Sequence, residues 1–390
     1  MKRIVQALTV GMFLLALFGF SVAFFVLPDQ SFSEQENRSL RMSPKLTLDG
    51  LISGEYAEAV NDYFADQFPL RDALVGCKGV AEVLAGRGEN NGILLGADGQ
   101  LARRLFSIRC ADGETVEDTD AFDVKHLKSS MEGLSRLSEH LDVPLTVMLT
   151  GRNIDVAASA FDYPTNPSNA LLDTIRAEKR GQYELLDTVP MYRERFERGE
   201  YVYYKTDHHW TSLGAYLAYV EIMRSFGMEN ETKNEDFFAK TVVSEDFYGS
   251  LWSAGGMKFV PPDRVEIWYG ADDGDYTVTA DGKQLEGFYT LSHLEKKDQY
   301  SVFLDGTHDV VTVTKKSGEE RPVLLIPKDS FANSLAPFLA RHFDLVLVNL
   351  SSKNDFTNVS DLAKSYGADR VLIVYTIENV ITADRLCRLK

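Results

Sequence analysis

Apolar residues are spread unevenly along this chain: an unbroken apolar run opens it, and helices alternating with buried strands fill most of the remainder. No charged residue occurs between Ile4 and Pro28, and a run of this length can cross a hydrocarbon core of about 30 Å as a helix. Lys2 and Arg3 precede the run, and by the positive-inside rule they hold the N-terminus in the cytoplasm. The pattern predicts a transmembrane anchor over residues 1–28.

The same run has a second interpretation, as a cleaved signal peptide. Ser21, Val22 and Ala23 place small residues near a possible cleavage point. The apolar stretch exceeds a usual signal-peptide core of about 7–15 residues, which favours a retained anchor. The sequence therefore predicts a single-pass protein of the cell membrane whose main domain is extracytoplasmic.

Residues 29–90 are predicted to form a stalk followed by helices. Residues 28–45 are polar and broken by prolines, with too few apolar side chains to pack, which is typical of an extended segment. The next segment places apolar residues at helical spacing with an interruption at Pro69. Two helices are therefore expected, one on either side of the sequence DQFPLRD.

From residue 91 onward, helices and buried strands alternate. The sequence NGILLGADGQL, residues 91–101, predicts a strand and a turn that open the main domain. Helical spacing then leads into continuous apolar runs at residues 123–150, 170–187 and 321–376, and another helix follows the sequence DHHW. Continuous apolar runs suit strands buried on both faces. The alternation predicts an α/β fold over residues 91–390, with a parallel sheet and flanking helices.

Residues 228–320 interrupt this alternation. They contain short segments in which apolar and polar residues alternate, EIWYG, DYTVTAD, YSVFLD and DVVTVTKK, separated by Asp-Gly and Ser-Gly turns. This pattern is typical of antiparallel strands. We interpret the region as a β-rich insertion and expect it to form a flap that faces the substrate.

Composition narrows the range of partners. The 390 residues include 41 basic and 58 acidic side chains, a formal charge of −17, which disfavours binding to nucleic acid or to anionic lipid. Cys77, Cys110 and Cys387 lie far apart and form no CxxC motif, so neither a zinc knuckle nor a dense disulfide framework is indicated. No metal or other cofactor is predicted.

Ser330 is the candidate nucleophile. It follows the apolar strand VLLIP, lies in the turn Lys328-Asp329-Ser330 and precedes a helix. Its hydroxyl should therefore lie at the carboxyl edge of the sheet, where open sheets bind ligands and where free N–H groups of a helix can stabilise an oxyanion. The alternative is that Ser330 or Asp329 only caps the helix, since both residue types are favoured there.

The sequence Asp207-His208-His209-Trp210 is the second chemical feature. In an extended loop, residues two apart point the same way, so Asp207 can hold the Nδ1 of His209 and leave its Nε2 to take the proton of Ser330. A zinc site made by Asp207, His208 and His209 is the alternative. No further His or Cys motif at ligand spacing supports zinc, so the triad of Ser330, His209 and Asp207 is favoured.

Further candidates for substrate binding surround these residues. His208 suits packing or substrate contact, and Trp210 suits either a structural wedge or stacking on a sugar ring. A second oxyanion donor could come from Arg152 and Asn153 after the strand VPLTVMLT, or from the turn Tyr248-Gly249-Ser250. A purely structural role in a turn explains Arg152 with Asn153, and Tyr248-Gly249-Ser250, equally well.

The chain resembles the DHHW protein family over most of its length. The resemblance rests on ENRSL, SGEYAEAVNDYFADQFPLRD, NGILLGADGQL, DHHW and KDSFANSLAPFLARHF, in that order along the chain. That family is similar to the SGNH hydrolase-like proteins of alginate O-acetylation. The resemblance implies a flavodoxin-like sheet, Ser330 as nucleophile, His209 as base and Asp207 as its orienting acid. It also implies an acetylated envelope polysaccharide or exopolysaccharide as substrate, and a membrane-bound O-acyltransferase as the acyl donor.

Two segments depart from the SGNH pattern. Lys328 stands where Gly is frequent before Asp-Ser, and VNLSSKN, residues 348–354, has no Asp-and-Arg pair after its strand. We therefore keep open three hypotheses: a serine-dependent polysaccharide O-acyltransferase, a carbohydrate esterase with the same triad, and a non-catalytic polysaccharide-binding or assembly factor. The last would stack sugars on Trp210, Trp252 or Trp268.

Overall fold

The computed structural model describes residues 2–33, 38–104, 108–111, 114–117, 124–162, 166–350 and 358–389. The chain forms two compact units, one made of residues 1–90 and 253–259 and the other of residues 91–252 and 260–390. Glu36 of the ENRSL sequence and the end of the VNLSSKN sequence lie outside the described residues.

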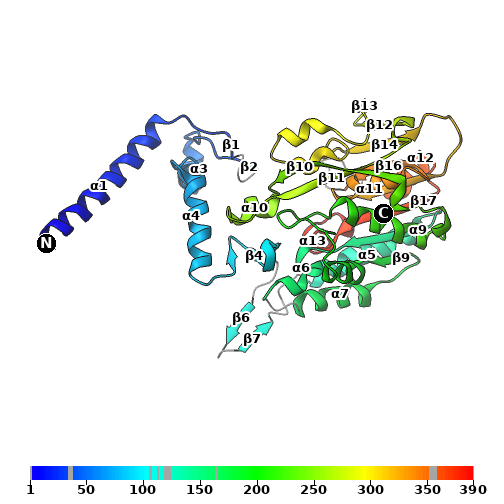
Figure 1. The fold of residues 1–390 in the computed structure, drawn as a ribbon, viewed down its shortest axis with the longest axis horizontal. Helices are drawn as coiled ribbons and strands as arrows, with labels where there is room; N and C mark the ends of the chain where they lie inside the picture. Colours follow the sequence, from blue (N-terminus) through cyan, green and yellow to red (C-terminus); the bar gives the residue numbers. More distant parts are fainter. Residues whose placement is uncertain are drawn as a thin grey trace. The chain divides into compact units, whose positions relative to one another are not determined.

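The first unit is mainly helical (Figure 1, blue). The helix α1 spans Lys2–Val26, and its length and apolar composition are sufficient to cross a membrane. Pro69 lies between the next two long helices, so the predicted pair is confirmed. The helices after α1 are α2 (Leu48–Ser53), α3 (Glu55–Asp66) and α4 (Arg71–Leu84).

The segment expected to be an extended stalk instead folds back on α3. Strands β1 (Phe32–Ser33) and β2 (Arg38–Ser39) pair in antiparallel fashion. The guanidinium of Arg38 donates to both carboxylate oxygens of Asp66 in α3, at 2.9 and 2.6 Å. The stalk prediction relied on the scarcity of apolar residues, whereas polar contacts order this segment.

The second unit is a mixed α/β fold around a large, mostly parallel sheet. Its strands lie in the order β13-β12-β14-β16-β15-β17-β8-β9, and the neighbours from β16 to β9 pair in parallel. The predicted parallel sheet is thereby confirmed. Its parallel strands are β8 (Leu145–Thr150), β9 (Glu184–Asp187), β15 (Val323–Lys328), β16 (Asp344–Asn349) and β17 (Arg370–Thr376).

Helices cover both faces of this sheet (Figure 1). Successive strand residues point to opposite faces; in β15, Leu324 and Ile326 join one core and Leu325 the other. One core is covered by α9 (Ser212–Ser225) and α11 (Ala332–Leu339). The other is covered by α5 (Val124–His140), α7 (Asn166–Glu178), α12 (Val359–Tyr366) and α13 (Ile377–Thr382). Burial on both faces explains the continuous apolar runs in the sequence.

Most strands of the β-rich region extend the main sheet. β14 (Val310–Lys315) pairs with β16 in antiparallel fashion, and β12 (Tyr276–Ala280) and β13 (Lys283–Gln284) continue that edge. β10 (Phe238–Phe247) and β11 (Asp263–Gly270) form a separate antiparallel pair.

The strand predicted for the sequence YSVFLD is wrong. A 3-10 helix occupies Gln299–Val302. Leu304 and Asp305 follow with φ of 53° and 59°, and the left-handed region is incompatible with a continuing strand. Tyr300, Val302, Phe303 and Leu304 are all buried, so this apolar pattern reflects packing around a turn.

The remaining elements are short. The predicted strand and turn at residues 91–101 correspond to β4 and β5, which pair in antiparallel fashion. Sequence periodicity did not predict α2, α6, α8, α10 or α13, which span four to nine residues. The bounds are β3 (Glu89–Asn90), β4 (Ile93–Leu95), β5 (Leu101–Arg103), β6 (Ile108–Ala111), β7 (Glu114–Glu117), α6 (Asn153–Val156), α8 (Val189–Glu197) and α10 (Ser250–Gly255).

Candidate active site

Ser330 lies in the turn between β15 and α11. The preceding Asp329 fixes this turn: its carboxylate accepts hydrogen bonds from the backbone amides of Thr376, at 2.6 Å, and Phe331, at 3.1 Å. Thr376 ends β17, so the turn is fastened to the neighbouring strand. The chain passes from β15 to β16 on one side and returns to β17 on the other. Open α/β sheets bind ligands at such a reversal, outside the carboxyl ends of the strands.

The DHHW sequence occupies the tip of a short hairpin. Tyr203 and Trp210 form an antiparallel bridge, and the amide of Tyr204 donates to the carbonyl of His209 at 3.1 Å. The side-chain amide of Asn153 donates to the carbonyls of Tyr204 and Asp207, both at 2.9 Å. The two strands of the hairpin and Asn153 together fix the backbone that carries Asp207 and His209.

A continuous hydrogen-bond chain joins Asp207, His209 and Ser330. The Nδ1 of His209 lies 2.5 Å from Oδ1 of Asp207, and its Nε2 lies 2.6 Å from Oγ of Ser330. With Nδ1 donating to the carboxylate, Nε2 is the nitrogen that accepts from the hydroxyl. Asp207 and His209 are 4% and 5% exposed, while Ser330 is only partly buried and so accessible to a substrate. The structure thus brings the predicted triad residues together.

Asp207 is held in its charged form. Burial alone would raise the pKa of this carboxyl, but His208, His209 and the hydrogen bonds from His209 and the Ser250 amide outweigh burial and hold the pKa well below its usual range. The Ser250 amide donates to Oδ2 at 2.8 Å. A carboxylate fixed in this way keeps the imidazole in one tautomer and can stabilise an imidazolium.

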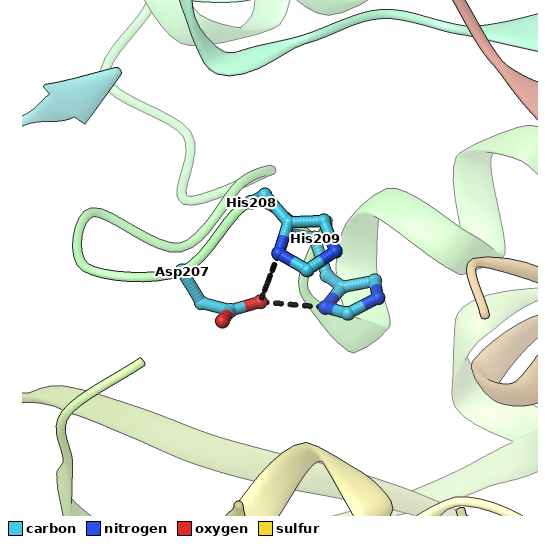
Figure 2. A group of neighbouring side chains, drawn as sticks. All are labelled: Asp207, His208 and His209. Carbon is cyan, nitrogen blue, oxygen red and sulfur yellow. Dashed lines mark hydrogen bonds and ion pairs between the residues drawn. The ribbon is translucent and has the colours of Figure 1, made fainter. Parts of the chain in front are cut away.

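The same loop offers the donors that the zinc hypothesis requires. Figure 2 shows a nitrogen of each imidazole turned toward the same carboxylate oxygen of Asp207, at 3.7 Å for His208 and 2.5 Å for His209. Ligands of a tetrahedral zinc with bonds of about 2.0–2.1 Å lie about 3.3 Å apart. The 2.5 Å between Oδ1 of Asp207 and Nδ1 of His209 is too short for these two atoms to be ligands of one zinc ion, and it is that of a short hydrogen bond. With Oδ1 of Asp207 and Nδ1 of His209 bound to each other, these two atoms do not fit a zinc ion in this arrangement.

Tyr300 is a site residue that the sequence did not reveal. Its ring stacks on the imidazole of His209, with the centroids 3.6 Å apart and the planes 6° from parallel. Its hydroxyl shares a 2.9 Å hydrogen bond with Ser334 and donates to the carbonyl of Ser330 at 3.4 Å. Burial raises the pKa of Tyr300 well above its usual range, so the hydroxyl remains a donor. Only its alternation with apolar neighbours marked Tyr300 in the sequence, and we assigned that pattern to a strand.

The tryptophans are placed inside the protein. Trp210 is 0% exposed, and its Nε1 donates to Ser334 at 2.8 Å, so it is a structural wedge and not a surface for stacking sugars. Trp252 and Trp268 are 9% and 1% exposed. His208, in contrast to these tryptophans, is partly exposed, and its Nδ1 lies 2.7 Å from Oγ of Ser250. Desolvation and the neighbouring His209 lower the pKa of His208.

The candidate oxyanion donors mostly support the DHHW hairpin. Arg152 forms an ion pair with Asp155 at 2.7 Å, and the Asn153 amide is bound to the hairpin carbonyls described above. The amide of Gly249 donates to Oγ1 of Thr206. Tyr248 packs on Trp252 with the ring centroids 4.6 Å apart. None of these hydrogen bonds points to Ser330.

The backbone N–H of Ser330 is a better candidate for an oxyanion donor. Within the described ranges, it makes no hydrogen bond to another part of the chain. It lies in the turn before α11, where N–H groups are not used by the helix itself. Its position next to Oγ of Ser330 is one from which a backbone N–H can donate to an oxyanion.

Lys328, the departure from the SGNH pattern, is buried beside this turn. Its side chain is 1% exposed, and its ammonium donates to Oδ1 of Asn333 at 2.6 Å. The amide of Asn333 donates onward to the carbonyl of Gly306 at 2.9 Å. Burial lowers the pKa of Lys328 to about 8. Lys328 thus ties the end of β15 to the first turn of α11, on either side of Ser330.

Comparison with known families supports the resemblance of the chain to the DHHW family. The model of the DHHW protein family matches residues 187–349, which include the hairpin and Ser330. The expected resemblance to the DHHW family is confirmed. No curated protein matches the chain.

Solved structures share the fold of this chain. A DHHW family protein from Eubacterium siraeum has a TM-score of 0.56 and 19% sequence identity, covering 75% of this chain and 95% of its own. Bacillus cereus PatB1, in a structure with a sulfonyl adduct, has a TM-score of 0.60 and 16% identity, covering 76% of this chain and 98% of its own. The O-acetyltransferase domain of Pseudomonas putida AlgJ reaches a TM-score of 0.45 at 14% identity, covering 75% of this chain and 92% of its own, a likeness too low for any conclusion.

Proposed function

We propose that the protein is a serine-dependent O-acyltransferase that acts outside the membrane on an envelope polysaccharide or exopolysaccharide. The observation that carries the proposal is the hydrogen-bond chain from Asp207 through His209 to Ser330. A serine, a histidine and a carboxylate in this order are the elements of nucleophilic acyl transfer. The resemblance to proteins of alginate O-acetylation supplies the expected acyl group, acetyl, and the expected acceptor.

The strand order supports an SGNH hydrolase-like, flavodoxin-like sheet. If the strand that leads to Ser330, β15, is counted first, the parallel strands β16-β15-β17-β8-β9 have the spatial order 2-1-3-4-5, which is that of flavodoxin-like folds. In this chain the strands counted first come last in sequence. The proposed fold is therefore a circularly permuted version, with Ser330 at the reversal between the first and third strands.

The first half of the proposed reaction loads the enzyme. Oγ of Ser330 attacks the carbonyl carbon of an acyl ester while Nε2 of His209 takes its proton, and Asp207 stabilises the imidazolium. The N–H of Ser330 donates to the developing oxyanion. When the carbon–oxygen bond to the leaving alcohol breaks, His209 returns the proton to that alcohol, and an acyl-Ser330 remains.

The second half transfers the acyl group. A sugar hydroxyl attacks the ester of Ser330, His209 takes the hydroxyl proton, and the proton returns to Oγ as the acyl–serine bond breaks. If water attacks instead, the same intermediate yields free acid. A carbohydrate esterase is therefore the second candidate function. The partial exposure of Ser330, which admits water to the site, supports it.

The proposed location is the outer side of a cell membrane, with α1 as a single-pass anchor. The length and apolar composition of α1 support this, and Lys2 and Arg3 favour a cytoplasmic N-terminus. A membrane-bound O-acyltransferase is the proposed acyl donor, because an anchored acceptor serine could receive an acyl group delivered across the same bilayer. The binding or assembly factor is less well supported, because the tryptophans expected to stack on sugars are buried.

Loading of Ser330 by an activated acetyl ester tests the proposal. Residues 29–390 are incubated with the ester, and the acetylated peptide is identified by mass spectrometry. We expect acetyl on Ser330, and none on the peptide from Ser330→Ala, while Ser317→Ala, a change in an exposed turn, should load normally. Equal turnover in wild type and Ser330→Ala, with no adduct, would refute both enzymatic functions. Adding a polysaccharide acceptor then separates them, since a transferase yields acetylated sugar and an esterase yields free acetate.

A further inference from the structure

The first unit carries an apolar tip between α3 and α4 that the proposed chemistry does not use. Phe64, Phe68 and Leu70 are large apolar residues that are 46%, 42% and 70% exposed. Exposed apolar residues that gather in one place mark a surface that binds a partner or a membrane. The question is what covers this tip.

The tip is stacked on α1 in an antiparallel ladder of aromatic rings. Phe24 stacks on Phe64 with the centroids 4.6 Å apart, and Phe20 stacks on Phe68 at 5.2 Å. Phe20 and Phe24 are separated by one turn of α1, whereas Phe64 lies in α3 and Phe68 lies two residues beyond its end. The chain from α3 to Phe68 therefore runs antiparallel to α1.

Polar contacts accompany both aromatic pairs of this ladder. The hydroxyl of Tyr63 donates to Asp29 at 2.9 Å. Gln67 and Gln30 exchange two hydrogen bonds, from the Gln30 amide to Oε1 and from Nε2 to the Gln30 carbonyl, each at 2.9 Å. Asp29 and Gln30 follow shortly after the apolar run of α1, while Tyr63 adjoins Phe64 and Gln67 adjoins Phe68, so the segment that leaves α1 is fastened beside each aromatic pair.

The depth of the tip follows from helix geometry. Phe20 precedes Leu27, the last apolar residue of the run, by seven residues, which corresponds to about 10 Å along a helix. A helix that lies in a membrane interface inserts its apolar face by about 5–10 Å. Phe68, which stacks on Phe20, would thus reach the acyl chains of the outer leaflet. An apolar groove lined by Met12, Leu15, Gly19, Pro69 and Leu70 continues this surface between α1 and the tip.

The backbone conformation at the tip also favours contact with lipid. Leu70 has a φ of 60°, a conformation that costs energy for a residue other than Gly, Asn or Asp. A turn in water would be served better by Asn, whereas a leucine that inserts into lipid would repay the strain. Exposure and backbone strain thus coincide at Leu70, which lines the groove beside α1.

We propose that the Phe68-Pro69-Leu70 tip inserts into the outer leaflet beside α1, so that the membrane-proximal unit is held by two apolar elements. The occupant of the surface is lipid acyl chain, and insertion needs no anionic headgroup, in keeping with the acidic chain. The inference rests on α1 spanning the membrane and is independent of acyl transfer.

Site-directed fluorescence in nanodiscs tests the insertion. The full chain, with Cys77, Cys110 and Cys387 replaced by Ser, carries a single cysteine labelled with an environment-sensitive dye in phosphatidylcholine nanodiscs without other proteins. The labelled variants are Leu70→Cys, Leu15→Cys in the middle of α1, and Leu84→Cys. Leu15 and Leu84 are 76% and 83% exposed, and Leu84 ends α4, about 20 Å from the tip.

Nitroxide lipids and aqueous iodide report the surroundings of each dye. We expect the dyes at positions 70 and 15 to be quenched several-fold more by nitroxide lipid than by iodide, with the reverse at position 84. A dye at position 70 that behaves like the one at 84, while the one at 15 lies in lipid, would overturn the insertion but keep the anchor; the tip would then be free for a protein partner. If the dye at position 15 is also open to iodide, the anchor itself is wrong.

A second variant tests the strain argument. Leu70→Asn should leave the thermal unfolding of the protein in detergent unchanged or raise its midpoint, because Asn tolerates the left-handed backbone. In nanodiscs, a dye at position 68 in this variant should become several-fold more accessible to iodide. Unchanged protection at position 68 would contradict a role of Leu70 in insertion.

Discussion

Lys328 gives the sharpest test of the energetics around Ser330. Burial lowers its pKa from 10.5 to about 8, because no carboxylate forms an ion pair with its ammonium within the described ranges. One pKa unit corresponds to about 1.4 kcal/mol, so the charged lysine should cost the fold about 3 kcal/mol at neutral pH. Lys328→Met removes the charge while keeping most of the apolar volume.

The sign of the pH dependence follows from linkage. Below pH about 8 the lysine is charged in both the folded and the unfolded chain, and the full cost of burial is present. Between about 8 and 10.5 the folded protein loses its proton first, so the cost disappears as the pH rises. The wild type should therefore gain about 2 to 3 kcal/mol relative to Lys328→Met between about pH 7 and pH 10.

The measurement is the free energy of unfolding of residues 29–390 in urea, followed by tryptophan fluorescence. Loss of the hydrogen bond to Asn333 destabilises the variant by about 1–3 kcal/mol at every pH and so does not alter the change with pH. Lys283→Met, at an exposed position, is the matched control and should track the wild type. A constant difference between wild type and Lys328→Met over the whole range would refute the burial of a charged lysine.

Asp207→Asn should lower the rate of acyl transfer by about 10⁴-fold, because the imidazole loses the partner that fixes its tautomer; stopped-flow assays with an activated ester measure this. The same variant should lose the stability that the Asp207 carboxylate supplies at neutral pH, a contribution that in the wild type declines only as the pH falls below the usual range of a carboxyl group. Tyr300→Leu should reduce kcat by up to about 10-fold through loss of the ring stack, while Tyr300→Phe keeps the stack and should retain most activity. Asn153→Ala leaves two buried carbonyls without their donor and should destabilise the protein by about 1–3 kcal/mol in urea unfolding; no change would contradict its role in the hairpin. Hydrogen bonds from Arg38 lower the pKa of Asp66 from 3.8 to about 2. The stabilisation that Asp66 gives the β1–β2 segment should therefore be complete above pH 3.8 and lost as the pH falls toward 2, as measured by hydrogen exchange.

The parallel strands and the meeting of Asp207, His209 and Ser330 could be predicted because each leaves a local trace in the sequence. A strand buried on both faces requires a continuous apolar run, as in β8, β15 and β17. The relation of Asp207 to His209 is also local, since residues two apart in an extended loop share a side. Ser330 was found from the junction of strand and helix on either side of it.

The supporting residues could not be predicted, because their partners lie far away in the sequence. Asn153 acts through carbonyls of the hairpin more than fifty residues later, and Tyr300 acts through the ring of His209. Neither contact leaves a periodic pattern. The 3-10 helix that carries Tyr300 even imitates a strand, because burial around the site selects the same apolar residues that burial in a sheet selects.

The topology explains why these distant residues meet at a single point. Ser330 lies 121 positions after His209, yet both belong to the edge where the sheet reverses its order. Asp329 links β15 to β17, Lys328 links β15 to α11, and Asn153, after β8, links that strand to the hairpin. Each link joins Ser330 or the hairpin that carries His209 to a different strand of the parallel sheet. A substitution that breaks one of these links should therefore change the distance between Ser330 and His209 while the sheet stays folded. Such a substitution should lower kcat even where the protein still unfolds cooperatively.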